Sequence, residues 1–178
     1  MIGTNILLRA VEPADMELLY LWENDMQIWH LSNTKAPFSK YLMEQYVMNA
    51  QQDIYAARQL RLMVDTNSHN GNNETVGCVD LFDFDPANRR AGIGILITEE
   101  QRGKGYGKES LEQIIDYSFN TLNLHQLYCN ILENNEQSLV LFQKQGFNIV
   151  GLKKDWTVVD GIWQNEYLLQ LMKREKLG

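Results

Sequence analysis

The sequence has 178 residues, of which 44% are hydrophobic and 22% are charged. This length and composition predict one globular domain over residues 1–178, with a sizeable core. The formal net charge of −7 argues against nucleic acid and anionic membranes as partners, because a phosphate-rich surface attracts a basic face. A cationic amine suits an acidic protein better.

The cysteines and the N-terminal segment predict a cytoplasmic protein. Cys78 and Cys129 lie in apolar, strand-like runs, so we expect two buried thiols and no disulfide. Residues 1–10 are too short and too polar for a signal peptide, and no apolar run approaches the length of a membrane span. No Cys-x-x-Cys pair or histidine cluster is present, so we expect no metal.

The first half of the chain predicts one strand, two helices and a strand pair. Pro13 with acidic neighbours is typical of a helix start, and Ser39 is a suitable cap for a second helix. Large aromatic residues usually anchor cores, so we interpret Trp22 and Trp29 as packing residues and not as substrate contacts. The predicted elements are a strand at 6–9, helices from 13 and after 39, a loop at 29–38, and strands at 60–64 and 76–84 around a polar hairpin loop at 66–75.

The second half predicts four further strands and two further helices. Gly146 is suited to end a helix, and Asp160-Gly161 is a strong signal for a type I′ hairpin turn. The predicted elements are strands at 91–98, 126–132, 147–159 and 162–172, and helices carrying Leu111 to Leu122 and Leu139 to Phe142. This order predicts an α/β (α+β) fold with a mixed sheet of about seven strands, flanked by about four helices.

A glycine-rich turn at 99–108, EEQRGKGYGK, joins the strand at 91–98 to the following helix. Glycines at alternate positions permit left-handed backbone and remove Cβ atoms that would block a ligand. The N–H groups of the first helical turn attract anions, and Arg102, Lys104 and Lys108 add positive charge. We expect a diphosphate to bind here, although a turn that only joins strand and helix is the alternative.

Two common phosphate loops do not fit this turn. A nucleoside-triphosphate loop requires Ser or Thr after Lys108, and the residue there is Glu109. The dinucleotide fingerprint counted from Gly103 requires glycine at the position of Lys108. The remaining pattern is R-x-x-G-x-G, formed by Arg102, Gly105 and Gly107, which resembles the acetyl-CoA pyrophosphate loop of the GNAT superfamily of N-acyltransferases.

Two further stretches carry the same resemblance. Residues 135–147, NEQSLVLFQKQGF, are similar to the family signature N-x-x-[SA]-x-x-L-Y-x-K-x-G-F. The opening at 6–15 and the residues Asn123-Leu124-His125 resemble the branch that holds the spermidine (diamine) acetyltransferases and the ribosomal-protein N-terminal acetylases. The resemblance implies the GNAT-type acyl-CoA N-acyltransferase fold over nearly the whole chain.

The resemblance also implies acetyl-CoA as cosubstrate and a set of residues that hold it. The pantetheine arm enters where the strand segments 94–98 and 127–131 splay apart, and backbone N–H groups of the first segment hold the oxyanion of the tetrahedral intermediate. The implied cofactor-binding residues are Leu96, Ile97, Thr98, Arg102, Gly103, Lys104, Gly105, Tyr106, Gly107, Lys108, Asn135, Ser138 and Phe142.

Proton transfer is where this chain departs from the family. An alkylamine with a pKa near 10.4 must lose a proton before it attacks, and Asp80 and Asp83 are the candidate groups for binding and deprotonation. The alternative is that both lie on the solvated face of a strand. A further family acid corresponds to Gly92 here and is therefore absent.

The tyrosine that protonates the leaving thiolate in many family members corresponds to Phe142, which has no proton to give. Tyr128 and Tyr106 are candidate replacements, and Tyr128 is the one we assign to catalysis. Protonation by the departing ammonium or by water is the alternative, and it requires no residue.

The expected function is therefore acetyl transfer from acetyl-CoA to a primary amine, with a polyamine such as spermidine as the expected substrate. Acetylation of a ribosomal-protein N-terminus and non-catalytic binding of acyl-CoA are the two alternatives. A homo-oligomer is compatible with the resemblance.

Overall fold

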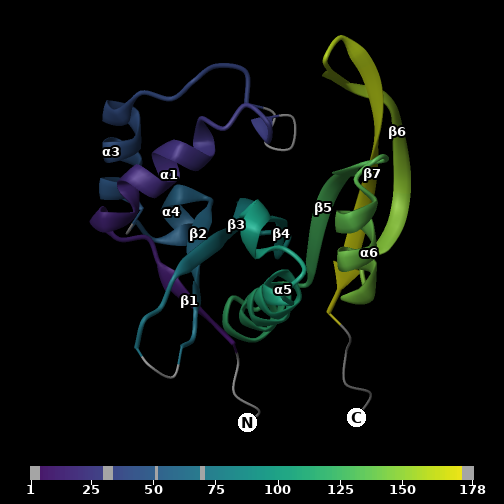
Figure 1. The fold of residues 1–178 in the computed structure, drawn as a ribbon. Coiled ribbons are helices and arrows are strands. Elements are labelled where there is room, and N and C mark those ends of the chain that lie inside the picture. Colours follow the sequence, from purple (N-terminus) through teal and green to yellow (C-terminus); the bar gives the residue numbers. More distant parts are fainter. Residues whose placement is uncertain (1–4, 30–33, 51, 69–70, 174–178) are drawn as a thin grey trace.

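The computed structural model describes residues 5–29, 34–50, 52–68 and 71–173 (Figure 1). Residues 30–33 of the predicted loop and residues 69–70 of the predicted hairpin loop lie outside these ranges. The strands are β1 (Ile6–Ala10), β2 (Leu60–Thr66), β3 (Thr75–Asp85), β4 (Arg90–Ile97), β5 (Gln126–Leu132), β6 (Asn148–Val159) and β7 (Ile162–Met172). The helices are η1 (Pro13–Asp15), α1 (Met16–Glu23), α3 (Lys40–Asn49), α4 (Ile54–Ala57), η2 (Glu99–Gln101), α5 (Tyr106–Asp116), η3 (Tyr117–Thr121) and α6 (Glu136–Lys144).

The predicted order of strands and long helices is confirmed. Within the described ranges, the helices of eight residues or more are α1, α3, α5 and α6. The single-turn helix α4 was not predicted, although Asp53 caps it by accepting a hydrogen bond from the N–H of Tyr55 at 2.9 Å. The helix after the glycine turn ends in a π-helical segment, η3, where the sequence predicted continuous α-helix.

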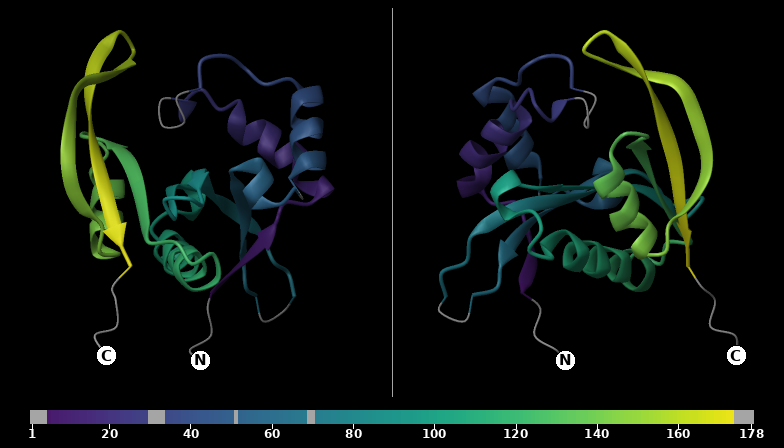
Figure 2. Two further views of the ribbon diagram at one scale, coloured as in Figure 1. Left: turned by 180° about the vertical axis from the view of Figure 1, so that it is seen from behind. Right: turned by 45° about the vertical axis from the view of Figure 1, so that its right-hand side comes forward.

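The seven strands form one mixed sheet in the order β1-β2-β3-β4-β5-β7-β6. All neighbouring pairs are antiparallel except β4 and β5, which are parallel. Helices α1 and α3 lie on one side of the sheet and α5 lies on the other, as Figure 2 shows. The fold class and the strand count predicted from the sequence are therefore confirmed.

Alternating side chains of the central strands pack into two separate cores, one on each face of the sheet. Val64 and Val79 belong to the larger core with Leu111 of α5. Their neighbours Met63 and Cys78 belong to the smaller core under α1 and α3. This alternation follows from the period of two along a strand, which sends successive side chains to opposite faces. The two cysteines are buried and free, as predicted.

Turns and caps follow the local sequence. The hydroxyl of Ser39 accepts a hydrogen bond from the N–H of Leu42 at 3.1 Å and so caps α3. Gly146 follows α6 with φ at +92°. Asp160 and Gly161 both have positive φ values, 51° and 77°, as a type I′ turn requires. These three predictions are confirmed.

The parallel strands β4 and β5 stay together over only a short distance. They pair at Arg90 with Gln126, Ala91 with Leu127 and Gly92 with Tyr128. Beyond this point β5 continues to pair with β7 as far as Leu132, while β4 continues with β3 (Figure 1). The two strands therefore splay apart, and the predicted splay between 94–98 and 127–131 is confirmed. In the described part of the chain, no helix is long and apolar enough to cross a bilayer.

Candidate active site

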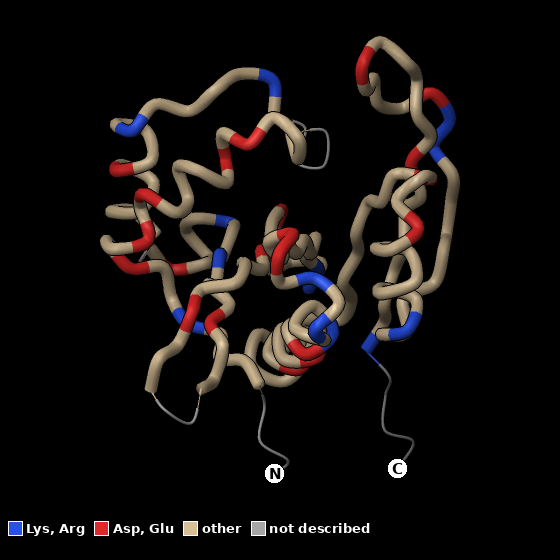
Figure 3. Tube along the Cα trace, viewed as in Figure 1, with Lys and Arg blue, Asp and Glu red and all other residues tan. Residues whose placement is uncertain are grey.

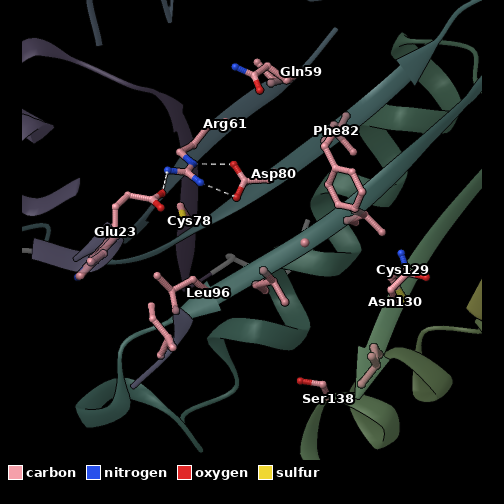
Figure 4. Close-up of a pocket in the computed structure, with 18 of the residues that line it drawn as sticks. Glu23, Gln59, Arg61, Cys78, Asp80, Phe82, Leu96, Cys129, Asn130 and Ser138 are labelled. Carbon is pink, nitrogen blue, oxygen red and sulfur yellow. Dashed lines mark hydrogen bonds and ion pairs between the residues drawn. The ribbon is translucent and has the colours of Figure 1, made fainter. Parts of the chain in front are cut away.

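A cavity of about 560 Å³ occupies the splay between β4 and β5. Its lining runs from α1 and α3, across β2, β3 and β4, to β5, α6 and one residue of β7. The cavity thus reaches both the edge of β4 that lacks a strand partner and the aromatic and charged side chains beneath α1 (Figure 4).

The free edge of β4 presents backbone N–H groups to the splay. The N–H of Thr98 donates to the carbonyl of Val76 on β3 at 3.0 Å, so Thr98 points away from the splay. Backbone direction alternates along a strand, and the register of β4 with β3 is regular from Gly92 to Ile97. Ile95 and Ile97 therefore direct their N–H groups into the splay. The N–H of Ile93 lies on the same side, but it belongs to the β4–β5 ladder that ends at the pair of Gly92 with Tyr128.

This geometry changes the expected role of two residues. The N–H of Thr98 is occupied, and that of Leu96 points toward β3 by the same alternation. Leu96 reaches the cavity through its side chain instead. Of Leu96, Ile97 and Thr98, which the resemblance assigned to the cofactor, only Ile97 offers a backbone N–H to the splay. Ile95, within the predicted segment 94–98, offers a second one.

The glycine turn has the geometry of an anion site. Gly103 and Gly105 have φ values of +77° and +89°, and Gly105 is the N-cap of α5. The first helical hydrogen bond runs from the N–H of Glu109 to the carbonyl of Gly105, at 3.1 Å. Within the described ranges, the N–H groups of residues 103–108 have no acceptor. These orphan donors coincide with the positive end of the helix dipole.

Basic side chains surround this turn, and Figure 3 shows blue segments at the entry to α5. The Nε of Arg102 donates to the carbonyl of Ile97 at 3.1 Å, which fixes the turn against the end of β4. The ammonium of Lys104 contacts the side-chain oxygen of Gln101 at 2.6 Å. Lys108 lies 3.3 Å from Glu112 on the surface of α5.

Gly107 has closer neighbours than Gly103 and Gly105. A Cβ atom at Gly103 or Gly105 would have nothing within 4 Å, so these positions are open. A Cβ atom at Gly107 would meet Leu141 at 3.5 Å and Ile97 at 3.7 Å. These are ordinary van der Waals distances, so Gly107 lies against α6 and β4, and the expectation that its missing Cβ atom clears space for a ligand stays a prediction.

Asp80 lies in the cavity wall, but it is not a free carboxylate. Arg61 binds it through two hydrogen bonds, of 2.6 and 3.0 Å, and reaches Glu23 of α1 at 2.5 Å (Figure 4). The ring of Tyr46 lies 5.6 Å from the guanidinium carbon. Burial alone would lower the pKa of Arg61, yet the charge and hydrogen bonds of Asp80 hold this pKa well above its ordinary value. We call Glu23, Arg61 and Asp80 the acidic triad, because two carboxylates and one guanidinium leave one net negative charge.

Asp83 lies outside the cavity, apart from Asp80. It is exposed and has φ at +48°, in the irregular stretch between Phe82 and Asp85. The hydroxyl of Tyr128 donates to its carboxylate at 3.0 Å. Burial, and then the hydrogen bond to Asp83, raise the pKa of Tyr128 to about 12. The structure therefore does not bring the two predicted acids together.

We expect Tyr128→Phe to lower kcat by less than about tenfold, whereas a well-placed general acid contributes 10²–10⁴-fold. A hydroxyl with a pKa near 12 is a poor donor to a thiolate, and neither Tyr128 nor Asp83 lines the cavity. The measurement is steady-state kcat, with CoA affinity as the control for folding. A hundredfold loss at unchanged CoA affinity would identify Tyr128 as the acid.

The position of the absent family acid is filled by an aromatic ring. A Cβ atom at Gly92 would lie 2.2 Å from the ring of Phe82, so a larger residue there would require this ring to move. Phe82 lines the cavity and meets Tyr128 edge-to-face, with ring centroids 5.9 Å apart. Phe82 therefore forms the apolar wall at the closed end of the splay.

The comparisons with known proteins agree with this geometry. Residues 5–148 match the family described as an acetyltransferase (GNAT) domain. The chain belongs to the GNAT acetyltransferase family. It is 25% identical to spermidine N(1)-acetyltransferase of Vibrio cholerae over 99% of this chain and 98% of that protein. It is 31% identical to a putative ribosomal N-acetyltransferase of Bacillus subtilis over 57% of this chain and 56% of that protein.

The crystal structure of Vibrio cholerae spermidine N-acetyltransferase in complex with CoA and spermine has the same fold, with a TM-score of 0.85. The two sequences are 23% identical, and the alignment covers 96% of each chain. The GNAT-type fold expected from the sequence is therefore confirmed, and the protein is an acyl-transferring enzyme.

In this GNAT protein the α6 signature residues lie beside the cavity. The side-chain oxygen of Asn135 accepts a hydrogen bond from the N–H of Ser138 at 3.2 Å and so caps α6. Both residues and Phe142 line the cavity. Phe142 is only 3% exposed and packs edge-to-face on Phe147 at 5.1 Å. Its ring is thus part of the core as well as of the cavity wall.

Sequence reasoning missed the α1 and β2 side of this site. Trp22 packs in the smaller core, as expected, but it also lines the cavity beside Glu23. Arg61 carried one signal, since a charged residue alternates there with Leu60 and Leu62 in a half-buried strand. Among the described residues, no group of three or more side chains is arranged to hold a metal ion.

Proposed function

We propose that this GNAT enzyme transfers an acetyl group from acetyl-CoA to a primary amine, and that the amine belongs to a diamine or polyamine. The main observation that supports this proposal is that carboxylates lie on both sides of the splay. The acidic triad lies toward β2 and β3, and Glu166 of β7 lines the opposite wall. A diamine needs acids at both ends of its pocket, because each of its nitrogens is an ammonium ion near pH 7.

The cofactor fits the two features that β4 and α5 create. The N–H groups of residues 103–108, together with Arg102 and Lys104, would hold the diphosphate. The pantetheine arm would lie along the free edge of β4 and replace the missing strand pairing. The thioester carbonyl would then accept hydrogen bonds from the N–H groups of Ile95 or Ile97. These donors are fixed before the reaction and would stabilise the oxyanion as it forms.

The amine would enter from the side of α1, where the acidic triad attracts its ammonium form. Arg61 contacts only one oxygen of Glu23 among the described contacts, which leaves the second oxygen as an acceptor for an incoming ammonium. Asp80 has both oxygens on Arg61 and would act by charge. The ammonium would lose one proton to water, and the neutral amine would attack the thioester carbonyl directly. The C–S bond of the tetrahedral intermediate then breaks, and the CoA thiolate takes up the proton that the new amide nitrogen releases, directly or through water.

No protein thiol would take part as a nucleophile. Cys78 and Cys129 both line the cavity. Burial raises the pKa of the Cys129 thiol to about 12, and burial followed by the charge of Asp80 raises that of Cys78 even further. Both thiols are therefore protonated near pH 7, and a thiol is a far weaker nucleophile than a thiolate. This supports direct transfer over an acetyl-cysteine intermediate.

A thiol-release assay with acetyl-CoA at pH 8 to 9 tests the proposal. The panel contains spermidine, putrescine and peptides that begin with Ala or Ser. We expect spermidine or putrescine to give the highest kcat/KM. A higher kcat/KM for the peptides would favour N-terminal acetylation. Binding of acetyl-CoA without thiol release from any amine would favour a non-catalytic acyl-CoA-binding protein.

A further inference from the structure

Lys153 lies at the start of an irregular stretch in the β6–β7 hairpin. It pairs with Glu166, and the next register pair joins Thr157 to Gln164. Three residues of β6, 154–156, therefore oppose the single residue 165 of β7. Asp155 adopts φ at +47° in this bulge, and its N–H donates to the side-chain oxygen of Asn165 at 3.0 Å. Bulges of this kind redirect side chains and are frequent beside active sites.

The bulge brings the ammonium of Lys153 into a site built from three other side chains. Its Nζ lies 2.5 Å from Glu166 Oε1 and 2.8 Å from Asn130 Oδ1. It also lies 4.7 Å from the centre of the Trp156 ring. A carboxylate, an amide oxygen and an indole face are all groups that bind an ammonium ion. We call Asn130, Trp156 and Glu166 the ammonium box.

The ammonium box opens onto the cavity. Asn130 and Glu166 both belong to the cavity lining, whereas Lys153 reaches them from the hairpin. Figure 4 shows Asn130 on β5, across the splay from Glu23, Arg61 and Asp80. A ligand that enters the cavity therefore meets the two oxygen-bearing members of the box directly.

Lys153 differs from the other cation in the site in how firmly it is held. Arg61 has 18% of its side chain exposed and is fixed by its planar contacts to two carboxylates. Lys153 has 27% exposed and lies on β6, the edge strand of the sheet. A lysine ammonium is a point charge on a flexible stem, and it can be exchanged for another primary ammonium without loss of charge or hydrogen bonding.

We propose that the ammonium box is a second ammonium subsite for the diamine or polyamine, which Lys153 occupies until the substrate displaces it. This inference rests on the proposed function. The reactive amine enters from the acidic triad, and the distal ammonium takes the place of the Lys153 ammonium. Lys153 therefore competes with the distal ammonium and lowers the apparent affinity for substrates that carry one, since an occupied subsite is available for only part of the time.

Lys153→Met in the full-length protein tests this. We expect KM for spermidine and putrescine to fall by about fivefold, with kcat and the KM for butylamine unchanged, because only the diamines reach the box. Glu166→Gln is expected to raise the KM for spermidine by about tenfold and to leave butylamine unaffected. Lys154→Met is the matched control. It removes an exposed positive charge from the same bulge, and no ion pair links Lys154 to the described residues, so each KM should stay as in the wild type.

Two results would overturn the inference. One is an unchanged spermidine KM in Lys153→Met, and the other is an equal fall for butylamine. Lys153→Arg retains a cation in the box and should keep the wild-type KM for spermidine. A lower KM for spermidine in this variant would therefore also contradict the inference. Calorimetric titration with spermidine in the absence of acetyl-CoA separates this inference from the proposed function. Tighter binding by Lys153→Met would support the box even in a protein that acetylates no amine.

Discussion

Replacing Arg61 with methionine is expected to lower the free energy of unfolding by about 3 kcal/mol, the scale found when one partner of a buried ion pair is removed. The change leaves Glu23 and Asp80 facing each other without a cation, and their side chains are only 19% and 28% exposed. Urea denaturation measures the effect as a lower midpoint at unchanged slope. Arg61 also closes one wall of the cavity, so we expect a loss of amine selectivity in whatever fraction remains folded.

A double variant identifies the cause of this loss. Adding Asp80→Asn to Arg61→Met removes one of the two unpaired charges and should recover about 1 kcal/mol of the loss. Asp80→Asn alone should destabilise the protein, because it weakens the contact to Arg61. If Arg61→Met and the double variant lose the same free energy of unfolding, the charge of Asp80 is not the cause. Arg61 would then stabilise the protein through packing.

Gly105→Ala is expected to raise the Kd for CoA by about tenfold or more, because left-handed backbone costs a residue with a Cβ atom 1–2 kcal/mol and tenfold in Kd is 1.4 kcal/mol. The φ of Gly105 is +89°, and it is the N-cap that sets the direction of the orphan N–H groups. A shift of the turn to relieve the strain would move these donors away from the diphosphate. Isothermal titration with CoA measures the change.

Gly71→Ala provides the matched control for this variant. Gly71 has a similar φ, +76°, and a Cβ atom there would likewise meet nothing within 4 Å, but it lies in the loop between β2 and β3. Both variants should lose a similar amount of stability, and only Gly105→Ala should lose CoA affinity. An unchanged Kd in a folded Gly105→Ala protein would remove the basis for the diphosphate site.

The fold was predictable because its information is local. Strands with period two, the glycine turn, the Ser39 cap and the Asp160-Gly161 turn are each specified by residues close together in the chain. The single-turn helix α4 was missed because four residues carry no periodicity, although Asp53 offered a capping signal. The splay of β4 and β5 was expected from the family resemblance, and not from any pattern within the strands.

The charged part of the site was predictable only in fragments. Asp80 was identified, but its state depends on Arg61, 19 residues earlier, and on Glu23, which lies 38 residues before Arg61. Lys153 likewise meets Asn130 across 23 residues of chain. No sequence spacing predicts such contacts. They depend on how separate helices and strands pack against one another. Asp83 lies on β3, as Asp80 does, but outside the cavity, at a bulge between Phe82 and Asp85 that no sequence pattern predicted.

The short pairing between β4 and β5 has a consequence for the molecule as a whole. Three register pairs form all of the β4–β5 ladder that links the β1-β2-β3-β4 half of the sheet to the β5-β7-β6 half. A pantetheine arm in the splay would act as an additional strand across this seam and would bind the folded state alone. Ligand that binds only the folded state stabilises it in proportion to the logarithm of its concentration. The resistance of this enzyme to heat and to proteolysis should therefore follow the acetyl-CoA supply of its cell.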